Sequence, residues 1–429
     1  MTTPSTTRRG FLATALAATS AGCAALPFVG GVSPPERVEP QTDAVTARYR
    51  FDGPLERPAV DGETVYAATA SRDDSFLPPT FDPTSPGLVA ALTSDGVEWH
   101  AETFAPATNR LRASDGQVYG PFGHAGASER RLLRVGPDRT VWRTDAVDKS
   151  LAVLGFDRET VYTGTYNDAV APFGGETVSA VDRTDGTTRW TAESGDTWNG
   201  LGVVIGGTLV VAVGGVATMA FATEDGTERW SVEERYLGVG TGSSTDAPVV
   251  ATVARGSDTP TVRGRNVDTG DERWHHVLDA DDNFVVAGGT TDRSTVYVTE
   301  FDGFVLALDA ADGSVRWSRQ FEDATRSEPV VAGDSLLVAG EGTLYALDRA
   351  TGETRWTASG SGGIDRVHSQ GDRVVVGTRL DEHRWRIRSL SLADGAERWT
   401  FTEEARQVWT TVGDVVAVGT SAGFLSVVE

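Results

Sequence analysis

Short runs of alternating apolar and polar residues recur along the chain from about residue 45 to its end. One stretch shows the pattern in full, with runs separated by Gly and Asp at 329–332, 335–339, 342–348 and 354–358. Strict alternation of this length, bounded by turn-forming residues, predicts β-strands with one buried face. No 3.6-residue period competes with it in this part of the chain. The pattern therefore predicts an all-β fold made of units of four short antiparallel strands, as in a β-propeller.

A short phrase that ends in tryptophan marks each unit. It reads DRTDGTTRW at 182–190, DAADGSVRW at 309–317 and DRATGETRW at 348–356. Looser copies extend the series, which then comprises Trp99, Trp142, Trp190, Trp230, Trp274, Trp317, Trp356 and Trp399. Neighbouring tryptophans of the series lie between 39 (356 − 317) and 48 (190 − 142) residues apart. A period of this size with internal turn signals predicts propeller blades or solenoid units.

Each residue type in the phrase has a mechanical role in a strand–turn–strand unit. An Asp side chain can accept hydrogen bonds from turn amides, and Gly supplies a positive φ where the last two strands reverse. The tryptophan then lies on the outer strand, where its ring can fill the space between blades and its N–H can reach a backbone carbonyl. We therefore interpret these tryptophans as structural; stacking on a ligand is the alternative.

With its Ala, Asp, Thr-Gly and Trp positions, the phrase resembles the PQQ-like repeat, which is found in quinoprotein dehydrogenases and in the outer-membrane assembly lipoprotein BamB. The resemblance covers about residues 45–429, and the most faithful copies are 307–317 and 346–356. It implies a propeller that usually has eight blades. The tryptophan units are followed by a partial one, 415–428, whose missing outer strand could come from 46–51. Strict counting then permits nine blades, and we expect eight because that number is usual for the family.

The first 22 residues have the features of an export signal. Arg8 and Arg9 precede Phe-Leu and an apolar run of about ten residues, which is too short to span a bilayer. The paired arginines resemble the twin-arginine signal, and the small residues before Cys23 resemble a lipobox. We therefore predict a lipid on Cys23, a flexible tether over 23–44 and a propeller over 45–429, on the outer face of the cytoplasmic membrane. An ordinary cleavage site beside an idle cysteine is the alternative.

The charge of the chain is strongly unbalanced. It has 61 acidic residues against 38 Lys and Arg, a formal net charge of −23, and its single lysine is Lys149. Such a surface repels phosphate backbones, so nucleic-acid binding is disfavoured. The composition resembles proteins of halophilic archaea, in which dense carboxylates hold water and cations while molar salt screens their repulsion. Codon bias in a GC-rich genome is the alternative explanation for the scarcity of lysine.

Catalytic motifs are scarce. The chain has one cysteine, so it can form no intrachain disulfide and no cysteine-based zinc site. Its histidines lack the i, i+4 spacing of a helical zinc site, and no phosphate-binding loop is present. The family resemblance implies PQQ with calcium as a candidate cofactor, yet we match none of the quinoprotein ligand positions. We therefore expect no catalytic and no metal site, with a PQQ-dependent dehydrogenase as the alternative.

Long connections on a rigid propeller are where binding residues are expected. In a four-stranded blade, the loops between strands two and three and those between blades share one face, and these are the irregular ones here. The candidate partner-binding residues in or near these loops are Trp198, Trp385, Trp409, Phe76, Phe81 and Arg384. The alternative for them is a role as caps of the core. The sequence thus predicts a monomeric, membrane-anchored propeller that binds envelope or secreted proteins, with binding of a small solute as a further alternative.

Overall fold

The structure is a computed structural model. It describes residues 33–429 apart from the segments 71–85, 125–128, 138, 167–175, 196–198, 214–216, 241–247, 255–259, 279–285, 323–327 and 361. The predicted signal with Arg8 and Arg9, the predicted lipid site Cys23, and the candidates Phe76, Phe81 and Trp198 lie outside the described residues. Residues Val32–Glu429 form one unit, and the regular elements described in it are β-strands.

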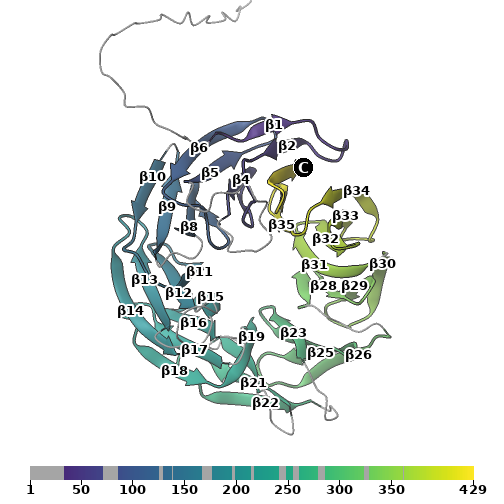
Figure 1. Ribbon diagram of the computed structural model, residues 1–429. Coiled ribbons are helices and arrows are strands. Elements are labelled where there is room, and N and C mark those ends of the chain that lie inside the picture. Colours follow the sequence, from purple (N-terminus) through teal and green to yellow (C-terminus); the bar gives the residue numbers. More distant parts are fainter. Residues whose placement is uncertain are drawn as a thin grey trace, which may run out of the picture. The chain divides into compact units, whose positions relative to one another are not determined.

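The strands group into antiparallel sheets that are the blades of a propeller (Figure 1). Blades 1 to 3 contain β3 (Ala59–Asp61), β4 (Thr64–Ala68), β5 (Gly87–Leu92), β6 (Val97–Thr103), β7 (Arg112–Ser114), β8 (Gln117–Gly123), β9 (Arg130–Gly136), β10 (Arg139–Arg143), β11 (Ser150–Phe156), β12 (Thr160–Tyr166), β13 (Glu176–Asp182) and β14 (Thr188–Gly195). Blades 4 to 6 contain β15 (Asn199–Ile205), β16 (Thr208–Val213), β17 (Ala217–Ala222), β18 (Glu228–Val232), β19 (Glu234–Gly240), β20 (Val249–Ala254), β21 (Thr261–Asn266), β22 (Glu272–Val277), β23 (Val286–Thr291), β24 (Thr295–Glu300), β25 (Phe304–Asp309) and β26 (Val315–Gln320).

The remaining strands complete the ring. Blades 7 and 8 contain β27 (Val330–Ala332), β28 (Ser335–Ala339), β29 (Thr343–Asp348), β30 (Thr354–Ser359), β31 (Gly363–Gln370), β32 (Arg373–Arg379), β33 (Arg384–Ser391) and β34 (Glu397–Glu404). Blade 9 contains β35 (Val408–Val412), β36 (Val416–Thr420), β37 (Phe424–Val428), β2 (Ala47–Arg50) and β1 (Glu36–Val38).

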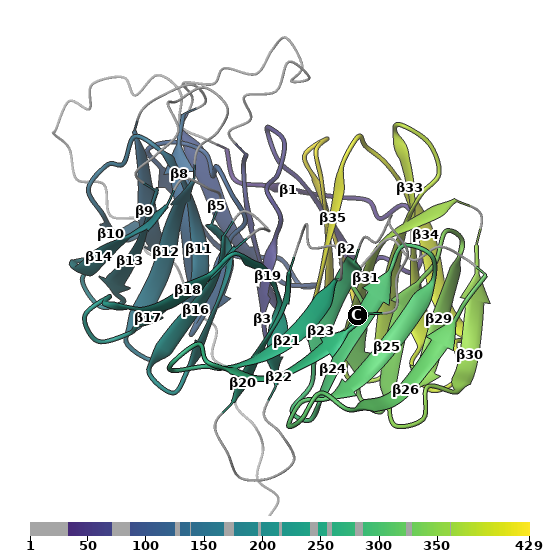
Figure 2. The ribbon, with the colours of Figure 1, turned by 90° about the horizontal axis from the view of Figure 1, so that it is seen from below.

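The first strand of each blade lies nearest the axis, and in blades 1 to 8 the later strands follow outward in chain order (Figure 1). In blade 9 the outward order is β35, β36, β37, β2 and β1. First strands of neighbouring blades contact each other in pairs such as β11 with β15, β19 with β23 and β31 with β35. The contact between β35 and β3 joins blade 9 to blade 1 and closes the ring. Seen from below, the strands of a blade run side by side between the two faces of the ring (Figure 2).

Blade 9 is assembled from both ends of the chain. β2 pairs with β37, from Ala47 opposite Val427 to Arg50 opposite Phe424. This register confirms the prediction that 46–51 supplies the outer strand of the last unit. The last unit is therefore a complete blade, and the prediction of eight blades was wrong, since the described residues form nine sheets. Strict counting of the units gave the right number, nine. Eight blades carry a phrase tryptophan, and the ninth is formed by the two ends of the chain.

The tether that we predicted over 23–44 overlaps a strand. β1 adds to the outer edge of β2, with Glu36 opposite Arg50 and Val38 opposite Arg48. Arg37 also donates a hydrogen bond to the backbone oxygen of Asp95 in blade 1, at 3.0 Å. A strand of three residues is too short to produce a readable alternation, which is why the sequence did not reveal it.

The hydrophobic core lies between neighbouring blades. One buried cluster combines Leu337 of blade 7 with Val374 and Val376 of blade 8. The intervening Val375 points to the other side of its sheet and joins a cluster with Val418 of blade 9. Each blade is thus buried on both faces, which explains why its middle strands are nearly continuous runs of apolar residues.

Tryptophans of the repeated phrase form the outer part of the blade interfaces. In six consecutive interfaces the indole N–H donates a hydrogen bond to a backbone oxygen in the turn of the next blade. The donor and acceptor residues, 2.8 to 3.0 Å apart, are Trp142 and Arg183, Trp190 and Thr223, Trp230 and Val267, Trp274 and Ala310, Trp317 and Arg349, and Trp356 and Leu392. An indole buried between blades therefore has its polar atom satisfied.

The glycine of the same turn lies directly against that tryptophan. At Gly352 the backbone φ is +70°, and a Cβ atom would lie 2.6 Å from the ring of Trp317. The glycines that meet the other five rings are Gly186, Gly226, Gly270, Gly313 and Gly395. Glycine is therefore required twice at this position, for the left-handed backbone and for the close approach of the ring. We call this paired contact the Trp–Gly lock.

The arginine before the tryptophan ties the turn to its own blade. Arg355 binds the carboxylate of Asp348 at 2.6 Å, and Arg189 binds that of Asp182 at 2.6 Å. Asp348 also accepts hydrogen bonds from the turn amides of Ala350 and Thr351. The bond from Arg355 is the main reason why the pKa of Asp348 lies below its usual value, and the turn amides add to it.

Candidate functional site

The two faces of the ring differ in how uniform their connections are. On one face, which we call the turn face, strands three and four are joined by the residues 93–96, 137–138, 183–187, 223–227, 267–271, 310–314, 349–353 and 392–396. On the other, the loop face, strands two and three are joined by 69–86, 124–129, 167–175, 214–216, 255–260, 301–303, 340–342, 380–383 and 421–423. The connections between blades also end on the loop face. The variation in the length of the connections is thus concentrated on the loop face of a regular scaffold.

The described candidates for partner binding are distributed unevenly between surface and core. Arg384 is exposed at the start of β33 and forms an ion pair with Asp381 at 3.1 Å. Trp385 beside it is only 4% exposed and Trp409 is 8% exposed. Trp385 packs in the cluster between blades 8 and 9, and its N–H lies 3.4 Å from the backbone oxygen of Arg406. A buried ring offers little surface to a partner. Trp385 and Trp409 therefore fit the alternative interpretation, in which they are core residues.

A buried ion pair holds the interface between blades 8 and 9. Arg48 on β2 donates to the carboxylate of Glu403 on β34 at 3.0 Å, and the two residues are 5% and 1% exposed. Ser426 on β37 donates to the second carboxylate oxygen at 3.0 Å. The guanidinium also lies over the ring of Phe424, 4.4 Å from its centre. Burial raises the pKa of Glu403 although Arg48 and Ser426 favour the charged form. We call this group the closure clasp.

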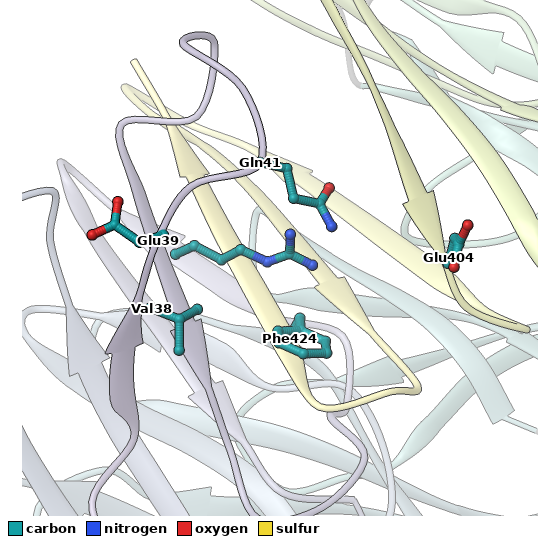
Figure 3. A pocket seen from close by; sticks show the side chains of 6 residues that line it. Val38, Glu39, Gln41, Glu404 and Phe424 are labelled. Carbon is teal, nitrogen blue, oxygen red and sulfur yellow. The ribbon is translucent and has the colours of Figure 1, made fainter.

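A pocket with a volume of about 480 Å³ lies next to the closure clasp. Its lining residues are Val38, Glu39, Gln41, Arg48, Glu404 and Phe424 (Figure 3). Glu404 lies across the pocket from Val38 and Glu39. Since Arg48 is already bound to Glu403, the polar groups that the pocket offers are mainly carboxylates and one amide. Such a lining suits hydrogen bonding to a polar segment of a partner.

A group of basic side chains lies along the axis on the first strands of consecutive blades. Its members, which we call the axial cluster, are Arg57 before β3, Arg110 and Arg112 at β7, and Arg366 and His368 on β31. The first strands of blades 8, 9, 1 and 2 are neighbours in the ring, through the contacts of β31 with β35, β35 with β3, and β3 with β7. All five side chains are half-buried.

Arg57 is the centre of the axial cluster. Its Nη2 lies 3.3 Å from Nε2 of His368 and donates to the backbone oxygen of Thr410 on β35 at 3.3 Å. Because a guanidinium can only donate, Nε2 of His368 must accept, which requires a neutral imidazole. Burial, and then the charges of Arg57 and Arg366, lower the pKa of His368 to about 4.

The arginines of the axial cluster also repel one another. Burial lowers the pKa of Arg57 to about 10, and the charges of Arg110 and Arg366 lower it further in the same direction. The pKa of Arg112 is lowered to about 10 by burial together with Arg110 and Arg57. These groups remain cationic at neutral pH, so the axis carries a concentrated positive charge in an acidic protein.

Sequence reasoning missed the axial cluster, although a signal was present. Arg110 and Arg112 flank Leu111, and Arg366 and His368 flank Val367. Alternation of this kind along an extended segment puts the two basic side chains on one side, with the apolar residue between them on the other. The pattern could have been found by aligning the first strands of all units and looking for charged residues at equivalent positions.

The described residues do not fit a calcium-bound quinone cofactor. They contain no group of three His, Cys, Asp or Glu side chains placed to hold a metal ion. The side chains identified at the axis are cationic and would repel calcium, which prefers carboxylate and carbonyl oxygens. Within these same residues, no helix is long and apolar enough to cross a membrane.

Blades of four antiparallel strands, a tryptophan phrase in eight of the nine, and a last blade closed by the two chain ends define a β-propeller of PQQ-like repeats. A family model described as outer membrane protein assembly factor BamB matches residues 128–287 and 284–428. The matched segments cover more than half of the chain, so the protein belongs to this family of BamB-like propellers.

Curated relatives match over shorter stretches. BamB of Yersinia pestis is 33% identical over 105 residues, which are 22% of this chain and 27% of the relative. BamB of Xanthomonas campestris is 32% identical over 108 residues, which are 24% of this chain and 25% of the relative. The chain thus spans about a quarter of the length of these curated relatives in the aligned parts.

Solved structures support the fold. BamB from Moraxella catarrhalis superposes with a TM-score of 0.55 and 13% identity, covering 74% of this chain and 95% of that one. The computationally designed Ika8 protein superposes with a TM-score of 0.54 and 14% identity, with the same coverage of 74% and 95%. Both are nearly fully matched while about a quarter of this chain lies outside the match. At this identity the likeness concerns the propeller fold alone.

Proposed function

We propose that the protein is a non-catalytic scaffold whose loop face binds other proteins of the cell envelope or secreted proteins. The observation that carries this proposal is the contrast between a turn face of short, similar turns and a loop face whose connections vary from 301–303 to 69–86. Binding residues are expected where variable connections are presented by a rigid scaffold. Membership in a family named for the assembly of outer membrane proteins supports the same conclusion.

The proposed location follows from the N-terminal residues. Arg8 and Arg9 would direct export by the twin-arginine route, and a lipid on Cys23 would anchor the protein to the outer face of the cytoplasmic membrane. In an archaeal cell without an outer membrane, the partners would be other envelope or secreted proteins. Replacement of the lipidated residue, Cys23→Ala, is expected to release the protein into the medium. Retention of that variant in the membrane fraction would contradict the anchor.

A crosslinked pull-down of the tagged protein from detergent-solubilised membranes tests the scaffold. Partners are identified by mass spectrometry for the wild type and for a loop-face variant, Trp198→Ala with Arg384→Glu. The matched control is Glu353→Arg, an exposed charge reversal on the turn face. We expect specific membrane or secreted proteins with the wild type and the control, and their loss from the loop-face variant. Equal recovery from all three proteins, or no specific protein at all, would contradict binding at the loop face.

The acidic composition leads to a further part of the proposal, namely that the fold depends on molar salt. With a net charge of −23, repulsion between carboxylates is long-ranged in dilute buffer and is screened within about 3 Å at 1 M salt. We expect the melting temperature to rise steeply with salt concentration. A cooperative melt that is unchanged in dilute buffer would contradict a halophilic protein.

A further inference from the structure

The axial cluster concentrates positive charge in a protein that is acidic as a whole. The chain has 61 acidic residues against 38 Lys and Arg, yet Arg57, Arg110, Arg112 and Arg366 gather along a single stretch of the axis. Asp365 offsets part of this charge at Arg366. Like charges at partly buried positions cost free energy unless a counter-charge lies nearby.

Other arginines in the ring have guanidinium groups that are hydrogen-bonded and paired with a carboxylate. Arg265 forms two hydrogen bonds with the carboxylate of Glu234, at 2.9 and 2.7 Å. Arg235 on β19, another first strand, donates to the backbone oxygen of Val286 at 2.9 Å and lies 3.9 Å from Glu328. Paired guanidiniums are therefore the usual arrangement in this protein, on a first strand as well as elsewhere.

Arg112 and Arg366 depart from that arrangement. The Nε atoms of both side chains are buried and have no hydrogen-bond partner among the described residues, as is also the case for the Nε atoms of Arg48, Arg134 and Arg388. Those three guanidiniums nevertheless donate hydrogen bonds through their Nη atoms. Arg366 lies 5.9 Å from the ring centre of Trp385, which is a weak substitute for an acceptor. A buried donor without an acceptor costs about 1–3 kcal/mol, and more when it is charged. The cluster thus holds unused donors as well as unbalanced charge.

We propose that the axial cluster is a binding site for a small, multiply charged oxyanion that carries carboxylate, sulfate or phosphate groups. Guanidinium groups form planar pairs of hydrogen bonds with such oxygens, which is why arginine is preferred for their recognition. Arg57, Arg112 and Arg366 come from three blades of one part of the ring and can donate to one ligand together. His368, held neutral by Arg57, adds a further donor through its Nδ1–H.

Arg112, Arg366 and His368 lie on first strands, whereas Arg57 and Arg110 lie in the connections that lead into blades 1 and 2. The anion site goes beyond the proposed scaffold function, and it can be tested by changing Arg112 without changing a connection of the loop face. It is also opposite in charge to a calcium site, which would need carboxylates at the same place. A bound anion would link blades 8, 1 and 2, which lie in one part of the ring next to the closure. Binding would therefore stabilise the ring as well as occupy the site.

Isothermal titration calorimetry of the full chain tests this proposal. Sulfate, phosphate and succinate are titrated separately, with chloride adjusted so that ionic strength stays fixed in every experiment. We expect saturable binding at one site in at least one arm, and the arm that binds more tightly identifies a tetrahedral oxyanion or a dicarboxylate as the preferred group. Absence of saturable heat with all three anions would overturn the proposal.

The diagnostic variant is Arg112→Gln, with Arg139→Gln on the exposed β10 as the control for loss of one charge. We expect at least about tenfold weaker anion binding for Arg112→Gln, since a charge-assisted hydrogen bond is lost, and less than a twofold change for the control. Because Arg112 has no partner in the described ring, its variant should melt no lower than the control without anion. Unchanged affinity, or a lower melting temperature of Arg112→Gln without anion, would show a structural arginine instead of a binding one.

Discussion

The ring is held by two different kinds of blade interface. Six consecutive interfaces, from blades 2 and 3 to blades 7 and 8, use the same Trp–Gly lock. The interface between blades 8 and 9 uses the closure clasp of Arg48, Glu403 and Ser426 instead. The lock joins residues about one unit apart in the chain, such as Trp317 and Gly352. The clasp joins Arg48 and Glu403, which are 355 residues apart.

This difference reflects what a repeated sequence can encode. Each unit can carry its own tryptophan and the glycine for the unit before it, so the six locked interfaces are specified locally. The ends of the chain have no following unit, and their meeting must be specified by residues that occur once. Long-range contacts also cost more chain entropy when they form, so the closure is expected to be the last step of folding.

Among the changes that separate the two kinds of interface, removal of the N-terminal strands is expected to have the largest effect on the stability of the ring. Deletion of residues 1–51 removes β1 and β2 together with Val45, Tyr49 and Phe51, which are buried in blade 9. Loss of several large core side chains at about 3–5 kcal/mol each exceeds the usual stability of a folded protein. We expect no cooperative unfolding transition in denaturant. Deletion of residues 1–31, outside the propeller unit, is the control and should unfold like the full chain.

The closure clasp should be sensitive to the loss of one partner only. Arg48→Ala leaves the carboxylate of Glu403 buried without a counter-charge, and we expect a loss of about 3–5 kcal/mol in the free energy of unfolding. The double variant Arg48→Met with Glu403→Leu removes both charges and should recover most of that loss. Denaturant titrations at fixed high salt give both values. If the double variant were as unstable as the single one, packing rather than charge would hold this interface.

The Trp–Gly lock can be separated from backbone strain by comparing two glycines. Gly352→Ala meets both a φ of +70° and the ring of Trp317, whereas Gly371→Ala meets a φ of +60° with open space around its Cβ. We expect about 1 kcal/mol for Gly371→Ala and about 2–4 kcal/mol for Gly352→Ala, because the second must also displace the ring. Equal losses in chemical denaturation would show that the contact with Trp317 adds nothing.

The smallest effect is expected at the surface pair of the phrase. Arg355→Gln removes the ion pair with Asp348, whose side chains are 38% and 28% exposed, and should cost at most about 1 kcal/mol. The pKa of Asp348 is lowered in the folded protein, so its stabilisation is present above the unfolded pKa and is lost as pH falls through the folded value. The difference in stability between wild type and variant should therefore shrink on acidification. A difference that stayed constant down to pH 2 would exclude the ion pair as its source.

The sequence was sufficient for the parts of the fold that repeat. The spacing of Trp190, Trp317 and their equivalents predicted blades, and the glycine of the phrase predicted the turn. It was also sufficient for the closing strand, since 46–51 was the one apolar segment left without a unit. The prediction of the number of blades was wrong because it followed the number usual for the family instead of the count of units in this sequence.

Features that occur once could not be predicted in the same way. Trp385 of blade 8 is buried in a cluster with Val418 of blade 9, which approaches it only after the two blades have packed. The axial cluster brings Arg57 to His368 across 311 positions of the chain. Their meeting depends on the number of blades and on the closure of the ring, and neither leaves a periodic signal in the sequence.

The Trp–Gly lock has a consequence for how such a protein can change by duplication. Because each unit from blade 3 to blade 7 offers a glycine to the unit before it and a tryptophan to the unit after it, the six junctions from blades 2 and 3 to blades 7 and 8 are chemically equivalent. One whole unit can be gained or lost by recombination within the gene, and the remaining tryptophans still meet a glycine. Only the residues of the closure clasp must then meet again, in a ring whose diameter is slightly different. Such interchangeable junctions let the number of blades vary within a family while each blade keeps its own sequence.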